Sequence, residues 1–375
     1  MKVCILSTVH IALDNRVFYR EAHSLRSAGY DVTLIAVHPK NEVKDGIQII
    51  GLPRVPRWQR PLLWRKIYRL ARQTTSDIYH FHDPELLPLG AWLKRRTGKP
   101  VIYDIHEAYP DFIEVKDYLP AWLRYPAAAL FRIVEPKLAR RQSGLIFADD
   151  ATAADFAQVD LPKETLFNFP GQQFIKTAVS AGNNYAERPP HVLYLGGMER
   201  NRGVDLMVEA FALVFAAIPT AQLWLVGHFM PPDLEQDVVQ AVAKHGLEQA
   251  VSITGRVDFE QIGQYLRSAS VGWVPWQAVA KNQKNIPTKL FEYMAYGIPI
   301  VGSDLQSIRP FLKDEDNGYL VSSDDPKRHA SAIINLLKNP QSGAAMGLRG
   351  QMQVLERYNW TIMEERLLRF YKEFL

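Results

Sequence analysis

Short apolar runs alternate with amphipathic stretches along most of the chain, and no other feature limits the possible folds as strongly. Short continuous apolar runs predict buried strands, and apolar residues that recur every three or four positions predict helices. In the first half we expect strands over 3–7, 31–37, 46–51, 77–82 and 100–105, and helices over 14–28 and 86–96. Strands that alternate with helices predict a doubly wound parallel sheet, and therefore an α/β protein.

The alternation stops once, over residues 169–190, where Gly, Pro, Asn and Gln are frequent. This composition is typical of a linker. The alternation then restarts after residue 190. We expect strands over 191–195, 222–226, 251–255, 271–274 and 299–303. We expect helices over 204–217, 234–245, 262–268, 288–296, 330–338 and 361–375. We expect two domains that face each other across a cleft, with ligands beyond the carboxyl ends of the strands.

Composition and charge exclude several classes of protein. Cys4 is the single cysteine, so neither a disulfide framework nor a cysteine-based zinc site can form. No apolar run approaches the length of a spanning helix, and the run at the start is too short for a signal peptide, so we expect a cytoplasmic protein. Residues 1–168 hold 24 Lys and Arg against 19 Asp and Glu, an excess that suggests an anionic partner for the first half.

The segment after the first strand carries three polar candidates, His10, Asp14 and Arg16. It lacks the glycine pattern of a dinucleotide site, and no Walker phosphate loop occurs in the chain, which argues against a dehydrogenase and an NTPase. Two interpretations stay open. The three residues contact a ligand, or they form a helix start that Asp14 caps.

Two further histidine motifs follow the fourth and fifth strands. His80 and His82 have the spacing of metal ligands on a strand, and Asp104, His106 and Glu107 are possible additional ligands. We favour an interpretation without metal, in which Pro84 begins a helix, Asp83 caps it and one histidine lines the cleft. His106, at the end of its strand, is a candidate to hydrogen-bond a substrate, the alternative being a structural histidine.

In the second half, Gly196 and Gly197 connect a strand to a helix and let the backbone approach a ligand closely. Arg202 lies at the start of that helix, where amides and the helix dipole favour an anion such as a diphosphate. Lys289 and Glu292 lie three residues apart at the start of a later helix, so they share a face. Spacing alone favours an ordinary surface ion pair for these two.

The order of these segments resembles that of family 4 glycosyltransferases, which are retaining enzymes of the GT-B fold. The resemblance covers nearly the whole chain, through HFHDPELLPLG (80–90), VIYDIHEAYP (101–110), LYLGGMERNRG (193–203), ITGRV (253–257), PTKLFEYMAYGIPIVGSD (287–304) and NWTIMEERLLRFYK (359–372). Lys284 stands where the family often has the first of two donor-site glutamates, Gly197 where it often has arginine, and Arg202 in place of lysine. The P-x-K-L-F-E-Y-M segment is similar to that of a subgroup.

The resemblance implies two Rossmann-like domains, 1–168 (acceptor side, completed by the helix 361–375) and 191–358 (nucleotide-sugar side). It implies transfer of a sugar from a UDP- or GDP-linked donor by front-face attack, without metal or cofactor. By resemblance the catalytic residues are His106, Arg202 and Lys289. The implied donor-binding residues are Gly197, Arg202, Arg256, Val257, Asn285, Pro287, Thr288, Lys289, Leu290 and Glu292, with Glu292 on the ribose, and the acceptor-side candidates are His10, Asp14, Arg16 and His82.

The basic stretch Arg54–Arg72 mixes cations with Trp58, Leu62, Leu63 and Trp64, and 121–141 does so less densely. Such stretches suit an anionic membrane surface, the alternative being a core-facing helix with solvated arginines. We therefore expect a peripheral enzyme at the inner face of the membrane that uses a glycan or lipid-linked acceptor in cell-surface polysaccharide or glycoconjugate synthesis, and no nucleic-acid partner. The rival interpretations are a nucleotide-sugar epimerase of GT-B fold and a nucleotide-sugar-binding partner without catalysis.

Overall fold

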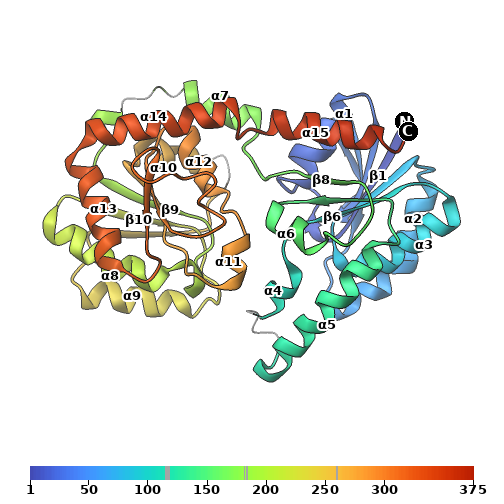
Figure 1. The fold of residues 1–375 in the computed structure, drawn as a ribbon, viewed down its shortest axis with the longest axis horizontal. Coiled ribbons are helices and arrows are strands. Elements are labelled where there is room, and N and C mark those ends of the chain that lie inside the picture. Colours follow the sequence, from blue (N-terminus) through green and yellow to red (C-terminus); the bar gives the residue numbers. More distant parts are fainter. Residues whose placement is uncertain (115–118, 181, 183–184, 259–260) are drawn as a thin grey trace. The chain divides into compact units, whose positions relative to one another are not determined.

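The computed structural model describes residues 1–114, 119–180, 182, 185–258 and 261–375. The chain forms two compact units. Unit 1 is Met1–Asn168 with Trp360–Leu375, and unit 2 is Phe169–Asn359. Both ends of the chain therefore belong to unit 1, as Figure 1 shows.

Unit 1 is built on an eight-stranded sheet in the order β3-β4-β2-β1-β5-β6-β7-β8. Its strands are β1 (Lys2–Ile11), β2 (Asp31–Val37), β3 (Glu42–Lys44), β4 (Ile47–Leu52), β5 (Ile78–Phe81), β6 (Val101–Ile105), β7 (Gly144–Phe147) and β8 (Lys163–Thr165). Its helices are η1 (Val17–Ala22), α1 (His23–Ser27), η2 (Arg57–Leu63), α2 (Trp64–Gln73), η3 (Pro84–Leu86), α3 (Leu87–Thr97), α4 (Tyr109–Glu114), α5 (Ala121–Ala139), α6 (Asp150–Asp155) and α15 (Trp360–Lys372). Only the β3–β4 pair is antiparallel among the described strand pairs of this sheet.

Unit 2 is built on a six-stranded sheet in the order β11-β10-β9-β12-β13-β14, and its described strand pairs are all parallel. Its strands are β9 (His191–Leu195), β10 (Gln222–Val226), β11 (Val251–Gly255), β12 (Val271–Val274), β13 (Ile300–Ser303) and β14 (Gly318–Val321). Its helices are α7 (Gln172–Ser180), η4 (Tyr185–Glu187), η5 (Arg200–Arg202), α8 (Val204–Ala217), α9 (Leu234–Lys244), α10 (Ile262–Ser268), α11 (Ala280–Lys284), α12 (Lys289–Ala295), α13 (Pro326–Lys338) and α14 (Pro340–Glu356).

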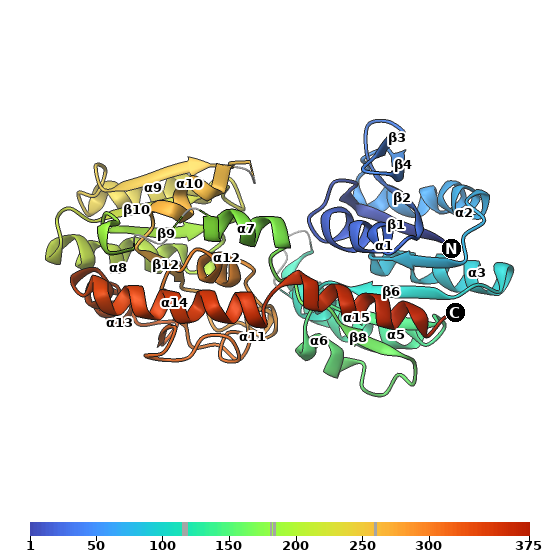
Figure 2. The ribbon, with the colours of Figure 1, turned by 90° about the horizontal axis from the view of Figure 1, so that it is seen from above.

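The predicted α/β class with doubly wound parallel sheets is confirmed in both units. Each sheet reverses its strand order beside its first strand, between β1 and β5 in unit 1 and between β9 and β12 in unit 2. Figure 2 shows helices on both sides of each sheet. At such a reversal the loops diverge to opposite faces of the sheet and leave a crevice at the carboxyl ends, where ligands of this fold class bind.

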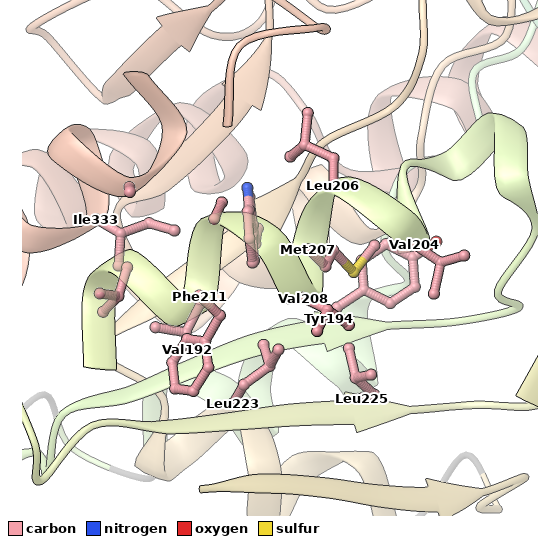
Figure 3. Packing of buried hydrophobic residues seen from close by; sticks show 14 of the residues in the cluster. Val192, Tyr194, Val204, Leu206, Met207, Val208, Phe211, Leu223, Leu225 and Ile333 are labelled. Carbon is pink, nitrogen blue, oxygen red and sulfur yellow. The ribbon is translucent and has the colours of Figure 1, made fainter. Parts of the chain in front are cut away.

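In unit 2, α8 is the helix that packs along the sheet beside this reversal. Figure 3 shows Val204 and Phe211 of α8 directed toward Val192 and Tyr194 of β9, all of them fully buried. Continuous apolar strands of this kind are expected when both faces of a parallel sheet are covered. The packing fixes the start of α8, and with it the loop that follows β9.

The structure differs from the prediction over 169–190, which is not a plain linker. Most of this stretch folds against unit 2, with α7 burying Ile175 and Ala178. The Tyr185 hydroxyl donates a 2.6 Å hydrogen bond to the Ser270 carbonyl. The segment is rich in Gly and Asn, so its average composition does not reveal the few apolar residues that pack against unit 2. Residues 181, 183 and 184 lie outside the described part of the chain.

Other elements also differ from the prediction. The helix expected over 14–28 is a π-helical turn, η1, continued by the short α1. The strands β3, β7, β8 and β14 and the helix α14 were not predicted; β3 and β8 have only three residues, too few for a periodic pattern. Among the described residues, no helix combines the length and apolar character that crossing a membrane requires.

Gly203, which precedes α8, holds the loop after β9 against the loop after β12. Its φ is +80°, and a Cβ there would lie 1.9 Å from the carbonyl oxygen of Pro275. Gly203→Ala should therefore cost about 3–5 kcal/mol, from left-handed strain plus the displaced backbone. Gly98→Ala is the matched control, since Gly98 is also left-handed but has open space around it. Equal losses for the two variants in urea unfolding would contradict the proposed contact.

Candidate functional site

The loop after β9 brings two cationic side chains to a pair of glycines in unit 2. Arg202 Nη1 donates a 3.1 Å hydrogen bond to the carbonyl of Gly197. Lys289, the first residue of α12, reaches the same loop at Gly196, where a Cβ would lie only 3.4 Å from Lys289 Nζ. Gly196 has a φ of +114°, so glycine is needed here both for the turn and for the space.

Lys289 is buried in an aromatic setting. Its Nζ lies 3.6 Å from the ring centre of Tyr194 and 5.6 Å from that of Trp276, and the Arg202 guanidinium lies 5.4 Å from the same Trp276 ring. Among the described residues, Lys289 Nζ has no hydrogen-bond partner. Burial, followed by the nearby Arg202 charge, lowers the pKa of Lys289 well below its ordinary value. Arg202 Nη2 lies 3.4 Å from Glu199 Oε1, so the unsatisfied group at this loop is the buried Lys289 amine, and a bound anion supplies the partner that this amine lacks.

The other predicted donor-binding residues lie later in the sequence of unit 2 and differ in the exposure of their side chains. Glu292 lies in the first turn of α12 and is half-buried, as are Asn285 and Val257. Arg256 and Thr288 are exposed, and Pro287 is buried. Leu290 has a fully buried side chain, and its amide donates to the Pro287 carbonyl. A contact of Leu290 with the donor stays a prediction.

In unit 1, the carboxyl ends of β5 and β6 bring together His82, Asp104 and His106. The ring nitrogens His82 Nδ1 and His106 Nε2 are 2.9 Å apart, and Asp104 Oδ2 lies 3.2 Å from the former and 3.4 Å from the latter. Burial lowers the pKa of His106 to about 4, against the opposing effect of Asp104. His106 is therefore neutral at pH 7, and it keeps some exposure while His82 has none. His82 can act on a ligand only through His106.

His10 lies over this pair, with its ring centre 4.7 Å from that of His106. Its ring nitrogens lie 3.5 Å from Asp14 Oδ2 and 3.9 Å from Asp83 Oδ1. Burial lowers the pKa of His10, but these carboxylates outweigh it and leave the pKa raised. Asp14 Oδ1 also accepts the amides of Arg16 and Val17, so Asp14 both holds His10 and caps the following turn.

Two predictions in unit 1 are corrected by the contacts. Arg16 is buried and directs its guanidinium at both oxygens of Asp104 (3.0 Å each) and at the Leu166 carbonyl (2.7 Å), so it holds the unit together and is not free for an acceptor. Asp83 precedes η3 but makes no side-chain cap there. Its carboxylate instead accepts from Ser7 Oγ at 2.9 Å and from the amides of Thr8 and Val9, which shapes the end of β1.

The sequence analysis missed the two aromatic residues that enclose Lys289. Tyr194 looked like any apolar position of β9, and Trp276 follows β12 at the point where the strand order reverses. The position of Trp276 after a strand at the reversal was the available signal. The pairing with Lys289 was not visible, because Tyr194 and Lys289 are far apart in the chain.

Two family profiles match the chain, one for each unit. Residues 15–167 match glycosyltransferase family 4, and residues 189–339 match the glycosyl transferases of group 1. The protein is a family 4 glycosyltransferase. The resemblance seen in the sequence is confirmed at the level of the family, while the subgroup of the 287–294 segment stays a prediction.

Relatives and solved structures agree with this assignment. The chain is 24% identical to the phosphatidyl-myo-inositol mannosyltransferase of Mycolicibacterium smegmatis, over 94% of this chain and 87% of that protein. It is also 24% identical to the amylovoran biosynthesis glycosyltransferase AmsK of Erwinia amylovora, over 48% of this chain and 44% of that one. Sucrose-phosphate synthase from Thermosynechococcus elongatus has the same GT-B fold, with a TM-score of 0.78, 19% identity and 99% and 98% of the two chains covered. HepE from Anabaena does too, with a TM-score of 0.73, 15% identity and 100% of both chains covered.

Arg16 provides a stability test of the unit 1 network. Arg16→Met should lower the free energy of unfolding by about 3–5 kcal/mol, because it leaves Asp104 buried without its cation. Arg309→Met is the control, since the Arg309–Asp304 pair is exposed and should contribute little. Urea unfolding of both variants measures the difference. A loss for Arg16→Met as small as that of the control would contradict the structural role of Arg16.

Proposed function

We propose that the protein is a retaining glycosyltransferase that moves a sugar from a nucleoside diphosphate to a glycan or lipid-linked acceptor. One observation carries this proposal. Arg202 and the buried Lys289 lie at Gly196 and Gly197, beside the strand reversal of unit 2, and Lys289 Nζ has no acceptor among the described residues, while Arg202 Nη2 lies 3.4 Å from Glu199 Oε1. A diphosphate supplies the acceptor that Lys289 lacks. HepE was solved with UDP, and a mannosyltransferase relative from Corynebacterium glutamicum is named for GDP-mannose, which supports a nucleotide-sugar donor.

The chemistry follows from these positions. The leaving group of the reaction is a nucleoside diphosphate, so catalysis depends on stabilising the charge that develops on its phosphate. Arg202 offers a planar guanidinium that can bind two phosphate oxygens. Lys289 offers an amine at Gly196 that can bind a further phosphate oxygen. Glu292, a turn further along α12, accepts the ribose hydroxyls. His106, neutral and partly exposed, hydrogen-bonds the transferred sugar.

The acceptor side is proposed from unit 1 and from the relatives. The relatives include enzymes named for phosphatidyl-myo-inositol and for amylovoran biosynthesis, so both a lipid and a glycan acceptor have precedent. We place the acceptor near His10 and His106. The enzyme then acts at the inner face of the membrane, in the synthesis of a cell-surface polysaccharide or glycoconjugate.

Ligand binding to the native state raises its melting temperature, so a screen of UDP-, GDP- and ADP-sugars identifies the donor. Arg202→Ala and Lys289→Met should each weaken binding of the matching nucleoside diphosphate by about tenfold or more, since a charged hydrogen bond contributes about 1.5–3 kcal/mol. Arg200→Ala is a matched control, because Arg200 is exposed and pairs with Asp205. Near-normal affinity in both site variants would refute the phosphate site. A new epimer formed from donor alone would instead support an epimerase.

Lys289 also predicts a pH dependence. Its pKa is low in the free protein, and a bound diphosphate raises it again, so binding takes up a proton. The affinity for the diphosphate is then highest at pH values below the pKa that Lys289 has in the free protein. It falls as the pH rises from that value through the pKa that Lys289 has in the complex. Calorimetry over a series of pH values from neutral up to the ordinary pKa of lysine, where the diphosphate is already ionised, in buffers of different ionisation enthalpy measures the uptake. The wild type should take up a proton and Lys289→Met should not; zero uptake by both would contradict the assignment.

The surface of unit 1 supports the proposed membrane contact. Trp58 and Leu62 of η2 are each 74% exposed, and no residue of η2 is buried. The core-facing alternative therefore fails for Trp58, while Trp64 is half-buried and packs against the core. On α5, Trp122 and Tyr125 are exposed as well, a second apolar surface among basic residues. Exposed Trp beside Arg suits an anionic lipid surface.

Flotation with vesicles tests this contact. Anionic vesicles should carry the protein and neutral ones should not, and binding should fade as salt rises, because each basic residue near the surface contributes only about 1 kcal/mol. Arg57→Glu with Arg65→Glu should abolish flotation, and Trp58→Ser should weaken it. Arg328→Glu on unit 2 is the charge-matched control. Equal recovery with neutral and anionic vesicles would contradict the proposal.

A further inference from the structure

Three buried polar side chains of unit 1 face one another without touching. Glu21 Oε2 of η1 lies 4.0 Å from His80 Nε2 on β5 and 3.7 Å from His82 Nε2 just after it. All three residues are fully buried. Both distances are too long for hydrogen bonds, and these three atoms have no hydrogen-bond partner among the described residues. Leaving three such groups unsatisfied is costly, since each lost partner costs about 1–3 kcal/mol.

The other ring nitrogen of each histidine is engaged. His80 Nδ1 lies 2.8 Å from the hydroxyl of Tyr371 on α15, and His82 Nδ1 lies 2.9 Å from His106 Nε2 and 3.2 Å from Asp104 Oδ2. Metal-binding histidines are oriented in this way, with one nitrogen held by a hydroxyl or carboxylate and the other free. With the protons on Nδ1, two Nε2 lone pairs and a carboxylate oxygen face a common point. Three acceptors facing one point require a cation or a donor between them.

The spacing distinguishes an ion from a water molecule. A water that hydrogen-bonds tetrahedral partners at about 2.8 Å holds them about 4.6 Å apart. A tetrahedral zinc with bonds of about 2.1 Å holds its ligands about 3.4 Å apart. The distances of 3.7 and 4.0 Å from Glu21 Oε2 to the two Nε2 atoms are too short for a bridging water. They need to shorten by a few tenths of an ångström to match a zinc ion. One water also has only two protons for three acceptors.

We propose that His80, His82 and Glu21 bind one zinc ion, with the Asp104 carboxylate available as a fourth ligand. The four ligand atoms lie within 4.8 Å of one another. Two imidazoles and carboxylate oxygens form a donor set that zinc favours. The ion holds η1 to β5 and, through His80 and Tyr371, orders α15. Its role is structural and does not depend on the donor proposed above.

Arg16 does not occupy the same position. It lies 2.9 Å from Glu21 Oε1 and donates to both oxygens of Asp104 at 3.0 Å, whereas the imidazoles face Glu21 Oε2. Two carboxylates and one guanidinium leave one net negative charge in a buried place, which a cation offsets. The competing occupant is a proton on Glu21, whose pKa is raised well above its ordinary value by burial and by Asp104.

Glu21→Gln separates zinc from a proton, because glutamine imitates a protonated glutamate but is a poor zinc ligand. The experiment measures zinc by mass spectrometry, and the melting temperature, on untagged full-length protein supplied with zinc and then dialysed. The wild type should retain about one zinc per chain and Glu21→Gln should lose it and melt at a lower temperature. His23→Gln is the matched control, since His23 is partly exposed beside Asp45 and should not affect the zinc content.

A wild type without zinc, together with a Glu21→Gln variant that melts as high as the wild type or higher, would overturn the proposal in favour of a proton. Zinc retained by Glu21→Gln would also overturn it. Should that variant not fold, chelation of the wild type in mild urea keeps the test: removal of zinc must lower the melting temperature, and added zinc must restore it. No change on chelation contradicts the site.

Discussion

A guanidinium and a buried amine held close together in a partly dehydrated place are the constraint on which the candidate site depends. Lys289 is buried against Tyr194, its Nζ has no acceptor in the described part of the chain, and burial, followed by the charge of Arg202, lowers its pKa. Both are directed at Gly196 and Gly197, where the backbone leaves room for a ligand. An anion stabilises this arrangement, and the proposed anion is the diphosphate of the donor.

Unit 1 repeats the same strand reversal with different chemistry. The ends of β1 and β5 place Asp83 beneath the amides of Thr8 and Val9, and the end of β6 adds Asp104 and His106. Carboxylates and the neutral His106 replace the basic side chains and glycines of unit 2. Such a site accepts hydroxyl groups and holds protons in place, which suits a sugar and its acceptor better than a phosphate. The two units thus share a topology and differ in the chemistry at their strand ends.

Much of the fold could be predicted from the sequence, for a physical reason. Buried parallel strands are continuous apolar runs, so β9, β10, β11 and β12 were predicted with the bounds that the structure has. The elements that were missed carry weaker local signals: α14 contains three glycines and a proline, and β8 has only three residues. Tertiary packing stabilises these elements, and a pattern along the chain does not report it.

The candidate site was predicted less completely, because its decisive contacts join distant segments. Arg202 and Lys289 were identified from their motifs, but the aromatic enclosure by Tyr194 and Trp276 was not. Glu21 was missed altogether, since nothing near it in sequence connects it to His80. Arg16 was identified as polar and near a strand end, and its position buried against Asp104 appears only in the folded chain.

The most direct test of the central claim compares nucleoside diphosphates with their nucleosides. Titration calorimetry of the wild type with UDP, GDP, uridine and guanosine isolates the contribution of the phosphates. If Arg202 and Lys289 hold the diphosphate, the better diphosphate should bind at least about a hundredfold more tightly than its own nucleoside, since two charged contacts contribute about 3 kcal/mol or more. Equal affinities for diphosphate and nucleoside would contradict the account.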